Sequence, residues 1–121
     1  MQKFLSPENR TALDVVNIVA GLGLALSPWY LGFTAESAAT WDAAIVGLAV
    51  ALIAAGTFFA FHQAEEIANF VLGLWAVIAP WALGYTAASA ATLAHVVGGL
   101  VVAIVAAGSL WLSTRRPYSA A

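Results

Sequence analysis

Four long apolar runs alternate with short polar segments along the chain. None of the four runs contains a formally charged side chain. At about 1.5 Å per residue, a helix of roughly 20 residues crosses the hydrocarbon core of a bilayer, which is about 30 Å thick. The pattern therefore predicts an all-α, polytopic membrane protein whose four transmembrane helices lie at residues 15–33, 43–61, 67–85 and 93–112.

The chain also contains an internal duplication. Residues 17–56 align with residues 69–108 without a gap, at a constant shift of 52 residues (69 minus 17), and about half of the positions are identical. Each copy holds two spans, so both copies enter the membrane from the same side. We expect two parallel tandem helical hairpins, related by a pseudo-twofold axis along the membrane normal and packed into a four-helix bundle.

The distribution of basic residues predicts the orientation. All of them lie near the two ends of the chain, and the loops inside the repeats have none: Lys3, Arg10, Arg115 and Arg116. By the positive-inside rule both termini face the cytoplasm, in agreement with an even number of spans. The predicted segments are a cytoplasmic N-terminal segment at 1–14, repeat 1 at 15–61, a cytoplasmic linker at 62–66, repeat 2 at 67–112 and a cytoplasmic tail at 113–121.

A Pro-Trp motif ends the first helix of each repeat. Each proline frees the carbonyl four residues earlier, Leu24 or Ala76, so we expect a kink there. The tryptophans suit the headgroup region, the glycines permit a turn, and Thr40 and Thr92 are expected to cap the second helices. The motif residues are Ser27, Pro28, Trp29 and Gly32 in the first copy and Ala79, Pro80, Trp81 and Gly84 in the second.

Small and amide side chains predict how the helices pack. Small residues spaced by four let two membrane helices approach closely, and a buried asparagine can donate a hydrogen bond across helices. We interpret the asparagines as interhelical contacts rather than as a polar pathway, because no acid or base was recognised near them. The predicted packing residues are Asn17, Gly21, Gly47, Ala51, Asn69, Gly73, Gly99 and Ala103.

The repeated Pro-Trp motif with its Leu-Gly-aromatic-Thr continuation resembles the SPW repeat family of small bacterial and archaeal membrane proteins. The resemblance covers nearly all of residues 17–108, although Ala79 stands in the second copy where the motif has serine. It implies a fold and a membrane location, a prokaryotic cytoplasmic (inner) membrane. It brings no activity and no catalytic residues.

Composition excludes several classes of function. The chain has no cysteine, which rules out disulfides, thiolate metal sites and cysteine nucleophiles. With four basic residues and a net charge of −2, it has no patch for a nucleic acid. We recognise no catalytic constellation, so we expect a non-enzymatic protein with no predicted cofactor and no metal.

Two side chains interrupt the repeat symmetry and are candidates for contacts. His95 stands where the first repeat has Ala43, and it could ligate the metal of a chlorophyll or haem, or be hydrogen-bonded to a carbonyl or water near the interface. Trp75 stands where the first repeat has Gly23 and offers a flat surface to a partner subunit or a pigment. A bound lipid or pigment stays open on this basis.

Our preferred hypothesis from the sequence is an accessory or structural subunit that packs against a larger membrane complex, respiratory or photosynthetic. The chain has almost no predicted mass outside the membrane, and its small-residue faces favour helix association. The alternative is a small homo-oligomeric channel or transporter lined by Asn17 and Asn69.

Overall fold

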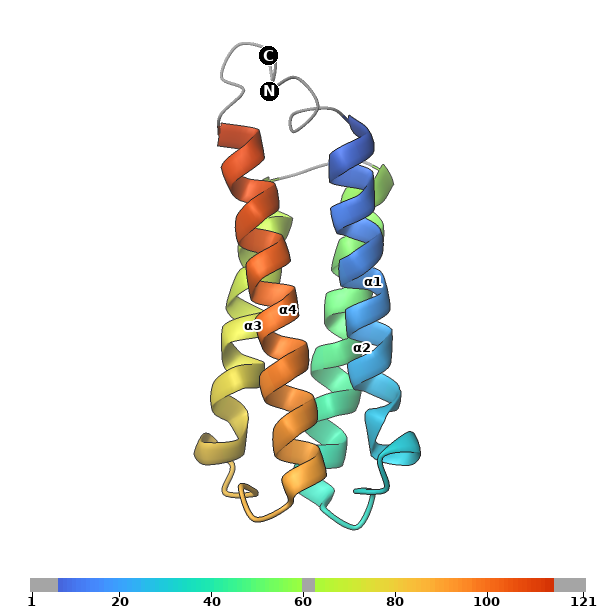
Figure 1. The fold of residues 1–121 in the computed structure, drawn as a ribbon, viewed down its shortest axis with the longest axis vertical. Coiled ribbons are helices and arrows are strands. Elements are labelled where there is room, and N and C mark those ends of the chain that lie inside the picture. The colour runs from blue at the N-terminus through green and yellow to red at the C-terminus, as the bar shows by residue number, and fades with distance from the viewer. Residues whose placement is uncertain (1–6, 60–62, 115–121) are drawn as a thin grey trace.

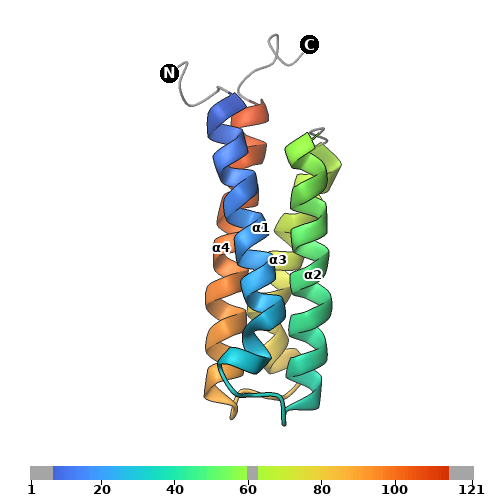
Figure 2. The same cartoon turned by 90° about the vertical axis from the view of Figure 1, so that its right-hand side faces the viewer.

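The computed structural model describes residues 7–59 and 63–114, which form a bundle of four helices (Figure 1). Helix α1 covers Pro7–Tyr30, α2 covers Ser37–Phe59, α3 covers Gln63–Ala82 and α4 covers Ser89–Thr114. Helices α1 and α2 form one antiparallel hairpin, and α3 and α4 form the other. Both hairpin loops lie at the same end of the bundle, called the loop end below (Figures 1 and 2). The predicted all-α fold of two parallel tandem hairpins is confirmed.

Each helix begins earlier than the apolar run that predicted it. Helix α1 begins at Pro7 instead of residue 15, and α2 begins at Ser37 instead of residue 43. Polar first turns are compatible with a helix whose start lies near the headgroups, so apolarity alone places the start too late. As a consequence five acidic residues lie inside helices, outside the predicted apolar runs: Glu8, Asp14, Asp42, Glu65 and Glu66.

The predicted capping role of the two threonines is wrong. Thr40 and Thr92 lie one turn inside α2 and α4, and their backbone amides already bond to Glu36 and Ala88 carbonyls. Their hydroxyls instead donate to loop carbonyls: Thr40 to Phe33 at 3.2 Å and Thr92 to Tyr85 at 3.3 Å. Each threonine therefore ties the loop to the helix that follows it.

Three helices contain a segment long and apolar enough to cross a membrane: Thr11–Tyr30 in α1, Ser37–Thr57 in α2 and Ser89–Leu112 in α4. Helix α3 does not meet the same criterion, because Glu65, Glu66 and Asn69 lie in its first turns. Its 20 residues nevertheless give a length of about 30 Å, and it runs beside α4 through the bundle (Figure 1).

Within each hairpin, the two helices pack through the predicted small-residue faces. A Cβ atom added at Gly21 would lie 2.6 Å from the Gly47 oxygen and 2.7 Å from the Ala51 nitrogen. In the second repeat, a Cβ at Gly73 would lie 2.7 Å from the Ala103 nitrogen and 2.8 Å from the Gly99 oxygen. Neither position has room for a side chain, so backbone meets backbone in both hairpins.

The Pro-Trp motif forms the same helix end twice. Gly32 and Gly84 have φ angles of 77° and 78°, and the amides that follow them bond back to the Pro28 and Pro80 carbonyls at 3.0 and 2.9 Å. This is the Schellman arrangement, which needs a left-handed residue after the helix. It turns the next aromatic residue, Phe33 or Tyr85, into the core, where the two are 5% and 3% exposed.

The serine of the first motif has a structural role. Ser27 Oγ donates to the Leu24 carbonyl at 2.6 Å, and Leu24 is the residue whose carbonyl Pro28 deprives of its helical partner. Ala79 has no hydroxyl to do this for Ala76. Figure 1 shows the last turns of α1 and α3 displaced outward from the helix axes, as the predicted proline kinks require.

Candidate functional site

A cluster of polar and aromatic side chains joins the two repeats at the loop end. Its members are Asp42 of α2, Trp75 of α3, His95 of α4 and Tyr85 of the loop between α3 and α4. Each of these positions differs from its counterpart in the other repeat, the four counterparts being Ala94, Gly23, Ala43 and Phe33. The cluster therefore occurs once in the bundle, although the fold around it is duplicated.

His95 lies at the centre of the cluster and is fully buried. Its Nδ1 lies 2.9 Å from the Ala91 carbonyl oxygen, one helical turn earlier. The Tyr85 ring meets the imidazole edge-on with centroids 5.2 Å apart, and the Phe33 ring lies at 6.5 Å. The two Schellman turns thus supply the aromatic walls around the imidazole.

Asp42 connects three helices. Its Oδ1 accepts a hydrogen bond from Trp75 Nε1 at 2.9 Å, and its Oδ2 lies 3.0 Å from His95 Nε2. Neither Oδ2 nor Nε2 has an aligned hydrogen-bond partner among the described residues, although the two atoms lie within contact distance of each other. The Asp42 side chain, which is 10% exposed, thereby links α2 of the first repeat to α3 and α4 of the second.

Tyr85 closes the cluster from the loop. Burial raises the pKa of its phenol above the ordinary value, and the nearby Asp42 carboxylate raises this pKa further. The phenol therefore keeps its proton throughout the physiological range. Its hydroxyl is buried and has no hydrogen-bond partner in the part of the chain that the structure describes.

The two candidates named from the sequence both fall in this cluster. Both His95 ring nitrogens are in contact with oxygen atoms, so a pigment metal would have to displace Asp42 or Ala91 to reach one. Trp75 is 37% exposed, and its indole N–H is directed at Asp42 while part of the ring stays at the surface. Its predicted contact with a partner stays a prediction.

Asp42 and Tyr85 were missed as site residues. Asp42 lies one residue before the span predicted at 43–61, whereas α2 begins at Ser37 and places Asp42 inside the helix. The alignment of the two repeats could have indicated that Asp42 and His95 lie close together. Ala94, the counterpart of Asp42, directly precedes His95, and Ala43, the counterpart of His95, directly follows Asp42. Helices α2 and α4 bring these neighbouring positions together across the pseudo-twofold axis.

A second set of buried polar residues lies toward the other end of the bundle and obeys the repeat. Asp14, Asn17 and Thr57 correspond at the shift of 52 to Glu66, Asn69 and Ser109, and all six are at most 3% exposed. Thr57 Oγ1 donates to Asp14 Oδ1 at 3.1 Å.

This arrangement corrects one argument from the sequence. Each asparagine has an acidic residue three positions earlier on the same helix face, Asp14 or Glu66, so acids do lie beside them. The Asn17 oxygen and both polar side-chain atoms of Asn69 have no hydrogen-bond partner within residues 7–59 and 63–114. Hydrogen bonding across helices by the asparagines therefore stays a prediction.

The two polar sets are separated by apolar side chains. Leu24, Val50, Ala76 and Val102 are at most 3% exposed and belong to the continuous core between them. The described residues contain no group of three or more His, Cys, Asp or Glu side chains that could hold a metal ion. The loop-end cluster offers one carboxylate, one imidazole and one indole N–H for charge and hydrogen bonds.

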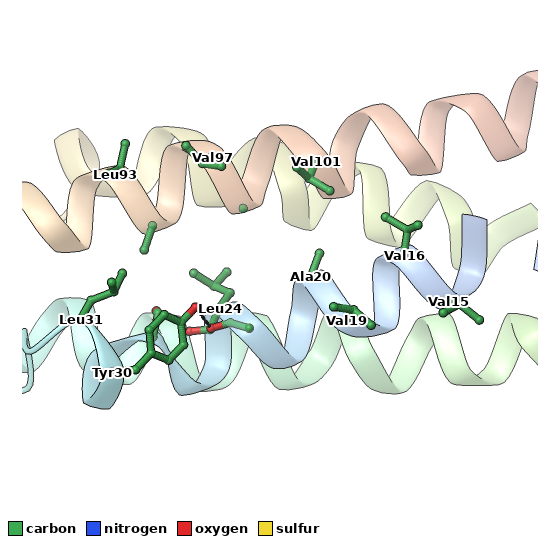
Figure 3. A pocket seen from close by; sticks show the side chains of 14 residues that line it. Val15, Val16, Val19, Ala20, Leu24, Tyr30, Leu31, Leu93, Val97 and Val101 are labelled. Atoms are coloured by element: carbon green, nitrogen blue, oxygen red, sulfur yellow. Dashed lines mark hydrogen bonds between the residues drawn. The ribbon is translucent and has the colours of Figure 1, made fainter. Parts of the chain in front are cut away.

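An apolar groove of about 610 Å³ lies between α1 and α4 (Figure 3). Val97 and Val101 of α4 line it opposite Ala20 and Leu24 of α1. Of the fourteen groove positions, the matching face between α2 and α3 carries a larger or polar side chain at seven and a smaller one at five. Three of the seven place the cluster residues Trp75 and Asp42, or Val46 one turn after Asp42, where the groove has glycine or alanine. These three groove residues and their counterparts are Gly23 and Trp75, Ala94 and Asp42, and Gly98 and Val46.

The comparison with protein families gives one match. The family model described as SPW repeat domain matches residues 11–109, most of the chain, and the chain belongs to this family. Comparisons with curated proteins and with solved structures give no significant match. Family membership and the apolar helices identify a small integral membrane protein, and its exposed leucine, isoleucine and valine side chains fit contact with a lipid bilayer.

Proposed function

We propose that this member of the SPW repeat family is a non-enzymatic accessory subunit that packs against a larger membrane complex through the groove between α1 and α4. The complex is respiratory or photosynthetic in this proposal, and the membrane is the prokaryotic cytoplasmic membrane. Both termini face the cytoplasm, in keeping with Lys3, Arg10, Arg115 and Arg116 near the chain ends.

The observation that carries the proposal is the difference between the two lateral faces of the bundle. The hairpins repeat each other, yet one face is filled by Trp75 and Asp42 and the other is hollowed at Gly23 and Ala94. Contact with lipid alone gives no reason for this difference, because lipid surrounds both faces. A partner that docks on one side does.

The groove fits a transmembrane helix of the partner. It extends from Val15 to Leu31 along α1, roughly 24 Å at 1.5 Å per residue, which approaches the full thickness of the hydrocarbon core. An acyl chain of one leaflet covers only about half of that thickness. Small residues on both walls, Gly23 and Gly98 among them, allow a helix backbone to approach closely.

The polarity of the groove restricts the docking helix. Two hydroxyls border it, and each already donates to a carbonyl of α1: Ser27 to Leu24 at 2.6 Å and Tyr30 to Gly23 at 2.8 Å. No charged side chain lines it. The partner helix is therefore apolar along its contact face and binds by shape.

The test fills the groove and measures partner recovery. Gly23→Trp copies the residue at the equivalent position of the other face, and a Cβ at Gly23 would meet only Tyr30 Oη, at 3.7 Å. The matched control is Leu26→Trp, on the same helix at a lipid-facing position that is 58% exposed and does not line the groove. Tagged proteins are extracted from the native membrane in mild detergent and analysed by mass spectrometry.

The wild type and Leu26→Trp should recover a larger complex in fixed stoichiometry, and Gly23→Trp should lose at least tenfold. Equal recovery by all three proteins would remove the groove as the docking face. Recovery of the chain alone as a symmetric oligomer would instead favour the homo-oligomeric channel, and ion flux through Asn17 and Asn69 variants in proteoliposomes would then be measured.

A further inference from the structure

We propose that Asp42 and His95 form a buried proton-binding site, in which one proton held between Asp42 Oδ2 and His95 Nε2 fastens the first repeat to the second. The site lies at the loop end and is separate from the groove between α1 and α4.

The Nδ1 atom of the imidazole determines which ring nitrogen carries the proton. His95 Nδ1 lies 2.9 Å from the Ala91 carbonyl oxygen, and a carbonyl oxygen can only accept. Nδ1 must therefore carry a proton and donate it. In a neutral imidazole with this tautomer, Nε2 has a lone pair and no proton.

The Asp42 carboxylate also presents a buried acceptor that lacks a donor. Asp42 Oδ1 is occupied by the Trp75 indole, which fixes the orientation of the carboxyl group. Oδ2 then faces His95 Nε2 at 3.0 Å. Without a proton, two lone pairs would meet at that distance, and two buried acceptors would both lack a donor.

One proton shared by Nε2 and Oδ2 would supply the missing donor between the two acceptors. On Nε2 it makes an imidazolium beside a carboxylate, and on Oδ2 it makes a carboxylic acid that donates to the imidazole. In either form the contact becomes attractive and joins α2 to α4. The proton comes from the aqueous phase at the nearby loop end, and no other co-reactant is needed.

The surroundings favour a proton over a metal ion. Besides the pair itself, α3 contributes the neutral Trp75, the loop after α3 contributes Tyr85, and the loop after α1 contributes the apolar Phe33. Tyr85 stays protonated, because burial and Asp42 raise its pKa, and it cannot serve as a phenolate ligand. Only one nitrogen and one oxygen are then available, whereas protein metal sites use three or four ligands.

Nitrogen-15 NMR of the histidine ring tests the site directly. The sequence contains two histidines, so His62→Gln leaves His95 as the only one. The variant is labelled at the imidazole nitrogens, placed in lipid nanodiscs and titrated over roughly pH 5–9, the range around ordinary histidine titration. The unfolding temperature is measured on the same samples.

The proposal expects a proton-bound form at the lower pH, with Nε2 either protonated or hydrogen-bonded to a protonated Asp42. As the pH rises, loss of that proton and a fall in unfolding temperature should occur in one step at the same pH. Asp42→Asn keeps an oxygen for Trp75 but ends the charge pairing, so this joint step should disappear. Tyr85→Phe should leave the step in place.

Two results would overturn the proposal. One is an Nε2 that is unprotonated and without a hydrogen bond at every pH at which the protein is folded. The other is an Nε2 signal that shifts on addition of Zn²⁺ and returns with a chelator, since the site would then be a metal site. The titration of His62→Gln, which keeps Asp42, Trp75 and Tyr85, remains decisive even if Asp42→Asn or Tyr85→Phe fails to fold.

Discussion

The two lateral faces of the bundle are formed by equivalent helices of the two repeats, but they differ in the side chains that they carry. Between α2 and α3, the Trp75 indole fills the surface and its N–H bonds to Asp42, which in turn contacts His95. Between α1 and α4, glycine and alanine occupy the corresponding positions and leave a groove of about 610 Å³. Residues shared by the two repeats form the contacts within each hairpin, whereas unshared residues form the Asp42–His95–Trp75 contacts on one face and the groove on the other.

The largest loss of stability is expected from removing the Asp42 carboxylate, which contacts His95 and Trp75. Asp42→Ala leaves buried His95 and the Trp75 N–H without their partner, and breaking a buried pair costs roughly 3–5 kcal/mol. The measurement is the free energy of unfolding in mild detergent. As a control, Ala94→Ser alters the equivalent position of the other face and should change little. A loss below about 1 kcal/mol for Asp42→Ala would show that these contacts are not stabilising.

The next effect tests whether the close helix contacts contribute equally to stability in the two hairpins. Gly47→Ala and Gly99→Ala would place a Cβ 2.5 Å from the Gly21 and Gly73 oxygens, so each should lose about 1–3 kcal/mol from forced backbone separation. A Cβ at Gly108 would meet nothing within 4 Å, so Gly108→Ala is the control without a clash. Very different losses for Gly47→Ala and Gly99→Ala would contradict the duplicated packing.

A smaller effect is expected from Trp75→Phe, which keeps an aromatic ring on the closed face but removes the donor to Asp42. Because the bond is partly exposed, we expect a loss of about 1 kcal/mol, toward the lower end of values for hydrogen bonds to charged groups. Thermal unfolding beside Trp81→Phe, a tryptophan that is 62% exposed near the loop end, isolates the donor effect. Equal losses in the two variants would remove the hydrogen bond from the account.

The smallest effect concerns the serine that names the first motif. Ser27→Ala leaves the Leu24 carbonyl without its donor and should cost about 1 kcal/mol or less. Ala79→Ser introduces the same hydroxyl beside Ala76 in the second repeat and should give a gain of similar size or smaller. The check is the unfolding temperature of both variants and of the double exchange, in which the two changes should largely cancel.

Sequence reasoning was strong where a pattern repeats. The apolar runs, the shift of 52 residues and the small residues around Gly21 and Gly73 predicted the bundle and its hairpin contacts. These features are local or periodic, so a single sequence contains them. The Schellman turns were only partly predicted: the glycines indicated a turn, but nothing showed that it would bury Phe33 and Tyr85.

The site was harder to predict, because it depends on contacts between repeats. Asp42 and His95 lie 53 positions apart, and each looked isolated within its own helix. The contact between Asp42 and His95 depends on how α2 packs against α4, and the hydropathy pattern does not specify this packing. Asp14 and Glu66 lie just outside the predicted apolar runs, so Asn17 and Asn69 were interpreted without the acid three positions earlier.

Single-cysteine crosslinking tests the central claim, that another subunit contacts the groove face and not the face between α2 and α3. The natural chain has no cysteine, so Val97→Cys on the groove and Ile45→Cys at the equivalent position of the closed face each carry a unique thiol. The two native side chains are 52% and 62% exposed. With a short photoactivatable maleimide in native membranes, the account predicts a crosslink from position 97 to a larger subunit and none from position 45. Crosslinks of equal yield from both positions, or from position 45 alone, would contradict it.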